Sequence, residues 1–322
     1  NINFTAAEKN IVKATNNGIY VGSDNSSNVT FTAGTNNEFI TGNNGIDHRG
    51  AGIVTVEATG ANIIRAGIKQ DTVLDSTKNA GYDINTIDKE TAFITDKDGD
   101  GVRIQGNGNV TLTAGTYNDI AARDTGLYIH GDSTNSTIEL IANGVNENGY
   151  GNIIYAEENG IQLDSENEAA DTSIIVTANN GSNSIYGKVN GIYNSGSGKI
   201  TINAKSDGIT TYADPIIGDP DNNIVGEQNG IQSDGTGITE VIAENGDNTI
   251  AGTKNGILSD GEGTITVTAG NNNTIGQYTD GSGTHTSESG INVSNGTVTV
   301  TSGNQNKIYG TKTGITATGE NS

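Results

Sequence analysis

A block of roughly 22 to 39 residues, most often near 25 or 34, recurs along the whole chain, and this repetition limits the possible folds more than any other feature. Each block begins with Gly-Ile, continues with an alternating segment that ends in Ala, and closes with an Asn-led segment. The copy that starts at Gly256 reads GILSDGEGTITVTAGNNNTIGQ. A repeat of this kind predicts a solenoid, in which each unit buries its apolar side chains against the next unit.

Three short strands are predicted in each unit. Segments such as Ile265–Ala269 alternate β-branched and polar residues with the period of two that is typical of a half-buried strand. An Asn-x-Ile segment such as Asn273–Ile275 supplies another strand, and the Gly-Ile pair starts the third. The Gly of that pair is Gly18, Gly45, Gly101, Gly126, Gly160, Gly191, Gly230, Gly256, Gly290 or Gly314, with a weaker copy at Gly67.

These strands predict an all-β fold, namely a right-handed parallel β-helix (solenoid) with three strands per coil. Counting the weaker copy gives about eleven coils, which at the usual strand spacing form a rod about 50 Å long. We expect residues 1–322 to form a single β-helix. Neither end resembles a cap and no Met is present, so we also expect this β-helix to be a fragment of a longer passenger chain.

Parallel stacking places equivalent residues in columns along the rod. One predicted column is apolar and internal, and it contains Val29, Val54, Val110, Ile138, Ile174, Ile200, Ile265 and Val298. A second column lies at a tight corner and contains Ala33, Ala58, Ala114, Ala142, Ala178, Ala204, Ala243 and Ala269. The Asn-Gly pairs at Asn17, Asn44, Asn159, Asn190, Asn229 and Asn255 predict turns with positive φ, with the Asn side chains hydrogen-bonded along the stack.

Three segments interrupt the repeat, near residues 69–98, 205–221 and 277–289. Insertions between coils leave a solenoid as loops, and such loops often carry the binding residues. The candidate ligand-binding residues are therefore the aromatic and ionisable side chains of these loops: Tyr82, Asp83, Tyr212, Asp214, Asp219, Tyr278, Asp280 and His285.

The charge of the chain argues against a nucleic-acid partner. The formal net charge is −22, and the 16 Lys and Arg residues are scattered rather than clustered. Such a field repels phosphate backbones, so we expect no nucleic-acid binding. The absence of Cys excludes a disulfide framework and suits a chain that crosses a membrane unfolded.

One acidic segment resembles the first half of a calcium-binding loop. Asp96, Asp98 and Asp100 alternate ahead of Gly101, and alternating carboxylates before a glycine turn are typical of Ca²⁺ ligation. The twelfth position of such a loop is Asn107 rather than a bidentate Glu. Two interpretations therefore stand: a Ca²⁺ site formed by these three aspartates, or an acidic turn. No other cofactor is expected.

The sequence offers no catalytic constellation, although several β-helices act on polysaccharides. Such enzymes need carboxylates clustered with a basic residue in a groove. Here the acidic residues are spread over all units, and the three histidines, His48, His130 and His285, fall in separate units. Trp is absent and only four Phe are present for stacking on sugar. We therefore assign no catalytic residue and expect a protein that is not an enzyme.

The repeated Asn-Gly-Ile, (Ile/Val)-Thr-(Ile/Val)-x-Ala and Asn-x-Ile patterns resemble the passenger domains of bacterial autotransporter (type V secretion) adhesins and filamentous-haemagglutinin-like β-helices. The resemblance covers essentially the whole chain. It implies a rod that is exported through the outer membrane and displayed extracellularly on the bacterial cell surface. A C-terminal outer-membrane β-barrel is then expected outside this sequence.

The same resemblance implies a role in attachment. The expected partners are a host-cell receptor, other bacterial surfaces or further copies of the same protein, which would lead to aggregation, biofilm formation and virulence. The alternative is a β-helical polysaccharide-acting enzyme or a glycan-binding module. Dispersed acidic residues and few aromatic residues favour the adhesin.

Overall fold

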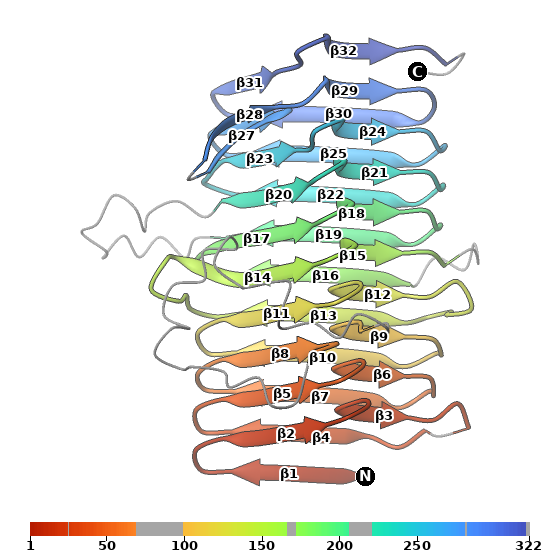
Figure 1. The fold of residues 1–322 in the computed structure, drawn as a ribbon, viewed down its shortest axis with the longest axis vertical. Coiled ribbons are helices and arrows are strands. Elements are labelled where there is room, and N and C mark those ends of the chain that lie inside the picture. Colours follow the sequence, from red (N-terminus) through yellow and green to blue (C-terminus); the bar gives the residue numbers. More distant parts are fainter. Residues whose placement is uncertain (25, 69–98, 166–171, 206–220, 281, 320–322) are drawn as a thin grey trace.

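The computed structural model describes residues 1–24, 26–68, 99–165, 172–205, 221–280 and 282–319. In these residues the chain forms a right-handed parallel β-helix, in which three sheets of ten parallel strands run the length of the rod (Figure 1). Each coil contributes one strand to each sheet, and successive coils hydrogen-bond in register. The described part of the chain contains no helix that is long and apolar enough to span a membrane.

The first sheet contains the alternating segments, the second the Asn-led segments and the third the Gly-Ile segments, as the repeat predicts. The first sheet consists of β1 (Ile2–Ala6), β4 (Val29–Ala33), β7 (Ile53–Ala58), β10 (Asn109–Ala114), β13 (Thr137–Ala142), β16 (Ser173–Ala178), β19 (Lys199–Ala204), β22 (Ile238–Ala243), β25 (Thr264–Ala269) and β30 (Thr297–Ser302). The second consists of β2 (Asn10–Ala14), β5 (Asn37–Thr41), β8 (Asn62–Ala66), β11 (Asn118–Ala122), β14 (Tyr150–Ala156), β17 (Ser182–Gly187), β20 (Asn222–Gly226), β23 (Asn248–Ala251), β26 (Asn272–Ile275) and β31 (Gln305–Ile308). The third consists of β3 (Ile19–Val21), β6 (Ile46–His48), β9 (Val102–Ile104), β12 (Leu127–Ile129), β15 (Asn159–Leu163), β18 (Asn190–Asn194), β21 (Asn229–Ser233), β24 (Asn255–Ser259), β29 (Ser289–Val293) and β32 (Thr313–Ala317).

The rod has ten coils in the described residues, so the prediction of about eleven was too high by one. The surplus copy is Gly67-Ile68. Gly67 follows β8 directly with φ of +70°, and the Ile68 N–H donates to the Thr41 carbonyl of β5, 3.0 Å away. The pair therefore extends the end of the second sheet, and β9 is the third strand of that coil.

The predicted apolar and alanine columns are confirmed. Every neighbouring pair within them stands in register, except that Thr239 occupies the apolar column between Ile200 and Ile265. Thr239 is fully buried and its hydroxyl accepts a hydrogen bond of 3.3 Å from the Asn194 amide. A polar residue is tolerated there because the core supplies a partner for its hydroxyl.

Glycine is required in the Gly-Ile column by close contact between coils, so the predicted positive φ was wrong. Among the described non-glycine residues only Asn135 has positive φ, and the positive-φ glycines do not include those that follow Asn17, Asn44, Asn159, Asn190, Asn229 and Asn255. A Cβ atom on Gly126 would instead lie 2.3 Å from Ile154 Cγ2 and 2.5 Å from the Gly160 carbonyl oxygen. The inner corner leaves no room for a side chain.

Substituting Gly126 with alanine tests this explanation. One contacting atom belongs to a core side chain of the next coil and the other to its backbone. The substitution therefore forces the two coils apart. We expect a loss of about 1–3 kcal/mol of unfolding free energy, which is typical of overpacking. Chemical unfolding should be compared with that of Gly131→Ala, whose Cβ meets only one atom, at 3.6 Å. Equal losses in the two variants would contradict the proposed contact.

Ladders of asparagine side chains stabilise two corners of the rod. In the second sheet a single ladder runs through all ten coils without interruption, with amide-to-amide distances of 2.8–3.0 Å. Its members are Asn10, Asn37, Asn62, Asn118, Asn152, Asn183, Asn222, Asn248, Asn273 and Asn306. A shorter ladder in the third sheet joins Asn159, Asn190, Asn229 and Asn255, as predicted for the Asn-Gly pairs.

His48 makes the stability of the rod dependent on pH. Its side chain is fully buried in the column that holds Val21 and Ile104, and its Nε2 lies 2.8 Å from the Gly52 carbonyl oxygen. Burial lowers the pKa of His48 below its ordinary value, against smaller opposing effects of that hydrogen bond and of Asp47. The folded state therefore favours the neutral imidazole.

The expected consequence is a loss of stability on acidification. Between the ordinary pKa near 6.5 and the lower pKa of the folded state, the unfolded chain binds more protons, so stability falls as the pH drops. Urea midpoints at pH 7.5 and pH 5 should differ less in His48→Val than in the unsubstituted protein. An identical pH dependence in the two proteins would contradict this assignment.

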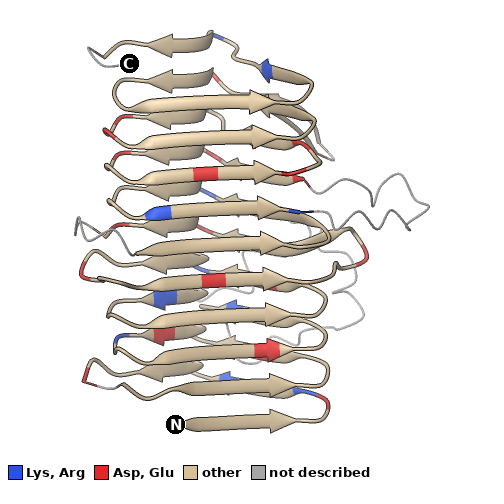
Figure 2. Cartoon of the chain, turned by 180° about the vertical axis from the view of Figure 1, so that it is seen from behind, with Lys and Arg blue, Asp and Glu red and all other residues tan. Residues whose placement is uncertain are grey.

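The outer face of the first sheet carries few charges (Figure 2). The charged residues in its strands are Glu57, Glu139, Lys199 and Glu240, and the last two pair across neighbouring coils at 2.8 Å. Most of the net charge of −22 therefore lies on other parts of the chain. The acidic surface that repels polyanions is not distributed evenly around the rod.

Candidate functional site

A β-hairpin brings together the three candidate residues of the third insertion. The strands β27 (Gln277–Asp280) and β28 (Gly283–Thr286) pair antiparallel between β26 and β29. Across this hairpin Tyr278 stacks on His285 with ring centroids 4.7 Å apart, and His285 Nε2 lies 3.1 Å from the Asp280 carboxylate. The Ser282 hydroxyl donates to the same Asp280 oxygen at 2.6 Å.

The carboxylate of Asp280 is held in its ionised form. Hydrogen bonds from Ser282, first from its hydroxyl and then from its backbone N–H, and a further one from His285 lower the pKa of Asp280 to about 2. Burial raises the pKa of Tyr278, and the charges of Asp280 and Glu227 raise it further. The hairpin thus presents a fixed anion beside a stacked aromatic pair.

The remaining loop candidates, Tyr82, Asp83, Tyr212, Asp214 and Asp219, lie outside the described residues. The same holds for the greater part of the first two insertions. These assignments stay predictions.

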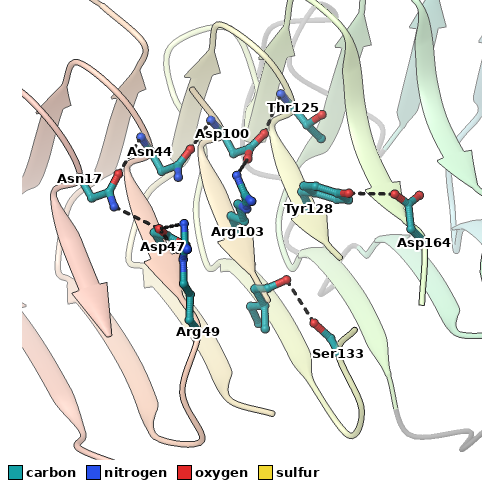
Figure 3. Close-up of polar contacts among 11 residues, drawn as sticks. Asn17, Asn44, Asp47, Arg49, Asp100, Arg103, Thr125, Tyr128, Ser133 and Asp164 are labelled. Carbon is teal, nitrogen blue, oxygen red and sulfur yellow. Dashed lines mark hydrogen bonds and ion pairs between the residues drawn. The ribbon is translucent and has the colours of Figure 1, made fainter. Parts of the chain in front are cut away.

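Asp100 occupies a structural position in the third sheet (Figure 3). Its side chain stands where Asn44 stands in the previous coil, and it is 1% exposed. The carboxylate accepts a hydrogen bond from the Thr125 N–H at 3.1 Å and pairs with Arg103 at 3.5 Å. Asp96 and Asp98 lie outside the described residues, so the calcium site remains a prediction. Within the described residues no three His, Asp or Glu side chains are grouped as a metal site would require.

The outer face of the third sheet carries an ordered network of tyrosine, amide and carboxylate side chains. The hydroxyl of Tyr128 in β12 donates a hydrogen bond of 2.8 Å to the Asp164 carboxylate. Figure 3 shows that this bond joins Tyr128 to the next coil. The amide of Gln162 donates to the same carboxylate at 2.9 Å, and the Ser195 hydroxyl donates to it at 2.7 Å. Asp164 thus accepts hydrogen bonds from three side chains that belong to three successive coils.

This arrangement recurs two coils further along the rod. Tyr193 of β18 donates to Asp234 at 3.2 Å, and Gln232 of β21 donates to Asp234 at 2.8 Å. Burial is the main cause that raises the pKa of both tyrosines, and the charge of the partner carboxylate is the next largest. The two phenols therefore remain protonated donors. We call the six residues Tyr128, Gln162, Asp164, Tyr193, Gln232 and Asp234 the third-sheet stripe.

On the outer face of the second sheet, the polar and aromatic side chains contact one another in a different arrangement from that of the third-sheet stripe. Arg65 and Asp119 form a buried ion pair with a 2.6 Å contact, and Tyr155 and Tyr186 stack on each other at 5.3 Å in adjacent coils. The Tyr186 hydroxyl also donates to Glu227 at 2.9 Å. These side chains are engaged with one another, which favours a stabilising role for this face.

The third-sheet stripe was not predicted, because the candidate binding residues came from the loops and not from the Gly-Ile strands. The signal lies in the residue after each Gly-Ile pair, which reads Tyr128, Gln162, Tyr193 and Gln232 in four successive copies. The acidic residue two positions after each Gln completes the pattern. Only alignment of the copies by coil makes this alternation visible.

No family model, curated protein or solved structure matches this chain, so the assignment of a function depends on the fold and on these surfaces.

Proposed function

We propose that the chain is part of a cell-surface adhesin, an extracellular passenger that attaches bacteria to host cells or to other bacteria. The observation that carries the proposal is the separation of core from surface in the ten-coil rod. The internal columns and the asparagine ladders stabilise the coils, so the outward side chains of the first sheet are available to contact a partner. Extended concave or flat faces of this kind are typical of solenoids that bind.

The charge distribution supports the same proposal. A net charge of −22 keeps the rod soluble, while the first sheet offers a broad, weakly charged face for contact with a receptor or a second rod. The alternative of a polysaccharide-acting enzyme finds less support, since the two carboxylates of the stripe lie two coils apart and each is engaged by a tyrosine and a glutamine.

Beads coated with the purified chain provide the test. Coated beads should adhere to cultured epithelial cells or to bacteria, or should cluster with one another, more than beads coated with an unrelated acidic protein. A variant in which one glycine replaces residues 277–286 tests the hairpin, because the ends adjoin through the Ser287 N–H to Gly276 carbonyl bond of 2.8 Å. Absence of adherence to all three targets would contradict the adhesive function.

A further inference from the structure

We infer that the third-sheet stripe binds an extended, uncharged, β-linked oligosaccharide. The inference rests on the adhesive function proposed above and names the class of ligand for one of its surfaces. It is carried by the spacing of the two tyrosines, the fixed polar groups between them and the charge of the surface.

The spacing of the two tyrosines suits stacking against alternate sugar rings. Tyr128 and Tyr193 stand in one column with Gln162 between them, so they are two coils, or about 10 Å, apart. Each hydroxyl donates to a carboxylate of the following coil, so both tyrosines point the same way along the rod. An extended β-linked hexose chain repeats after two residues over a closely similar length, so alternate sugar rings meet successive tyrosines.

Gln162 is what distinguishes this stripe from the tyrosine pair on the second sheet. Tyr155 and Tyr186 occupy adjacent coils and stack with an interplanar angle of 3°. Tyr128 and Tyr193 are separated by the amide, so neither can stack on the other in this way. Both tyrosines and both glutamines are partly exposed, and Asp234 is exposed, so the stripe is accessible to a ligand.

The polar groups follow the same two-coil period. Asn159 donates to Gln162 at 2.7 Å and Gln162 donates to Asp164, while Asn229 donates to Gln232 at 2.9 Å and Gln232 donates to Asp234. Each row holds its amide and carboxylate in one orientation before any ligand arrives. Groups that are fixed in advance lose less conformational entropy on binding. Carboxylate and amide oxygens facing outward are suited to accept hydrogen bonds from sugar hydroxyls.

The charge of the stripe selects against acidic sugars. Its ionisable residues other than tyrosine are Asp164 and Asp234, and the nearby Arg103 is paired with Asp100. A uronic or sialic acid would meet like charges with no cation of the stripe to compensate them. The ligand class is therefore a neutral hexose or N-acetylhexosamine chain.

Calorimetric titration of the purified chain tests this inference. The probes are cellohexaose and chitohexaose as neutral β-linked chains, maltohexaose as an α-linked chain that does not extend, and polygalacturonate as an acidic polymer. We expect measurable binding to at least one β-linked hexamer, and weaker or no binding to maltohexaose and polygalacturonate. Failure to bind either β-linked hexamer, or a preference for either control, would overturn the inference.

Variants locate the binding to the stripe. Because an aromatic contact contributes roughly a factor of 2 to 12, the double variant Tyr128→Ala/Tyr193→Ala should bind about tenfold more weakly or worse. Tyr20→Ala is the matched control, since Tyr20 lies in the same column in the first coil, is 57% exposed and lies outside the stripe. Tyr128→Phe/Tyr193→Phe keeps both rings in a folded chain and should lose less affinity than the alanine pair. Equal affinity of the unsubstituted protein and the alanine pair would place binding elsewhere.

The bead experiment separates this inference from the adhesive function. Adherence that persists when no hexamer binds would overturn the ligand class and leave the adhesin standing. Hexamer binding that depends on the two tyrosines, without adherence to any target, would support the stripe and contradict the adhesin.

Discussion

Substitution of Asn152 by alanine is expected to lower the free energy of unfolding by about 3–9 kcal/mol, because it breaks the asparagine ladder in the middle of the rod. The Asn152 side chain is fully buried and accepts a hydrogen bond of 2.9 Å from Asn118. Its own amide donates to the Thr177 carbonyl at 2.9 Å and to Asn183 at 2.8 Å. Removing it leaves buried groups of three neighbours without these partners, and each such group costs about 1–3 kcal/mol.

Two further variants show whether hydrogen bonding or shape is responsible. Asn152→Asp has nearly the same shape, but its carboxylate cannot donate to Asn183 and Thr177, so it should destabilise at least as much as alanine. Asn304→Ala removes an exposed asparagine and should change stability by less than about 0.5 kcal/mol. Denaturant unfolding followed by circular dichroism measures all three. A stable Asn152→Asp protein would show that the ladder contributes through packing alone.

Arg65→Ala is expected to destabilise the rod by about 3–5 kcal/mol, because it leaves the charge of Asp119 buried without its partner. The guanidinium and the carboxylate are 4% and 8% exposed and make two contacts, Nη2 to Oδ2 at 2.6 Å and Nη1 to Oδ1 at 3.0 Å. The residues in register with this pair are apolar, namely Ile40, Ile63, Ala121 and Ile153. None of the described residues in register with the pair can replace the lost cation.

The double variant Arg65→Met/Asp119→Leu should recover most of that loss. Two apolar side chains of similar size fit the isoleucine and alanine neighbours and remove the cost of burying charge. Unfolding free energies of the two single variants and the double variant form a cycle that isolates the coupling between the residues. If the double variant is as unstable as the sum of the single variants, the ion pair is not the unit that stabilises this face.

The repeat pattern allowed the fold to be predicted because each coil obeys the same local rules. Period-two segments such as Ile265–Ala269 became strands of the first sheet, and the columns through Val110 and Ala114 formed in register. One coil too many was counted because Gly67-Ile68 matches the Gly-Ile pattern but lies at the end of a strand of the second sheet. A two-residue signal does not specify which sheet it belongs to.

The physical role of the Asn-Gly pairs was predicted only in part. Hydrogen bonding between Asn190 and Asn229 followed from stacking, but the need for glycine at the next position came from contact with the following coil and not from backbone torsion. The longest ladder, through Asn152 and its equivalents, was not predicted although the Asn-x-Ile motif was recognised. The motif shows that an asparagine begins each strand; it does not show that the side chain points inward.

The sequence by itself determined the architecture, because the alternation of apolar and polar residues sets which side of each strand is buried and the repeat sets how the strands stack. Only the tertiary structure decided which side chains meet on the surfaces. Tyr128 and Asp164 are 36 residues apart in the chain, and Tyr193 and Asp234 are 41 residues apart, yet each pair is hydrogen-bonded between coils. Stacking in register brings single residues of separate units together into one ordered stripe. Because these contacts form between units, the sequence of any single unit does not predict them.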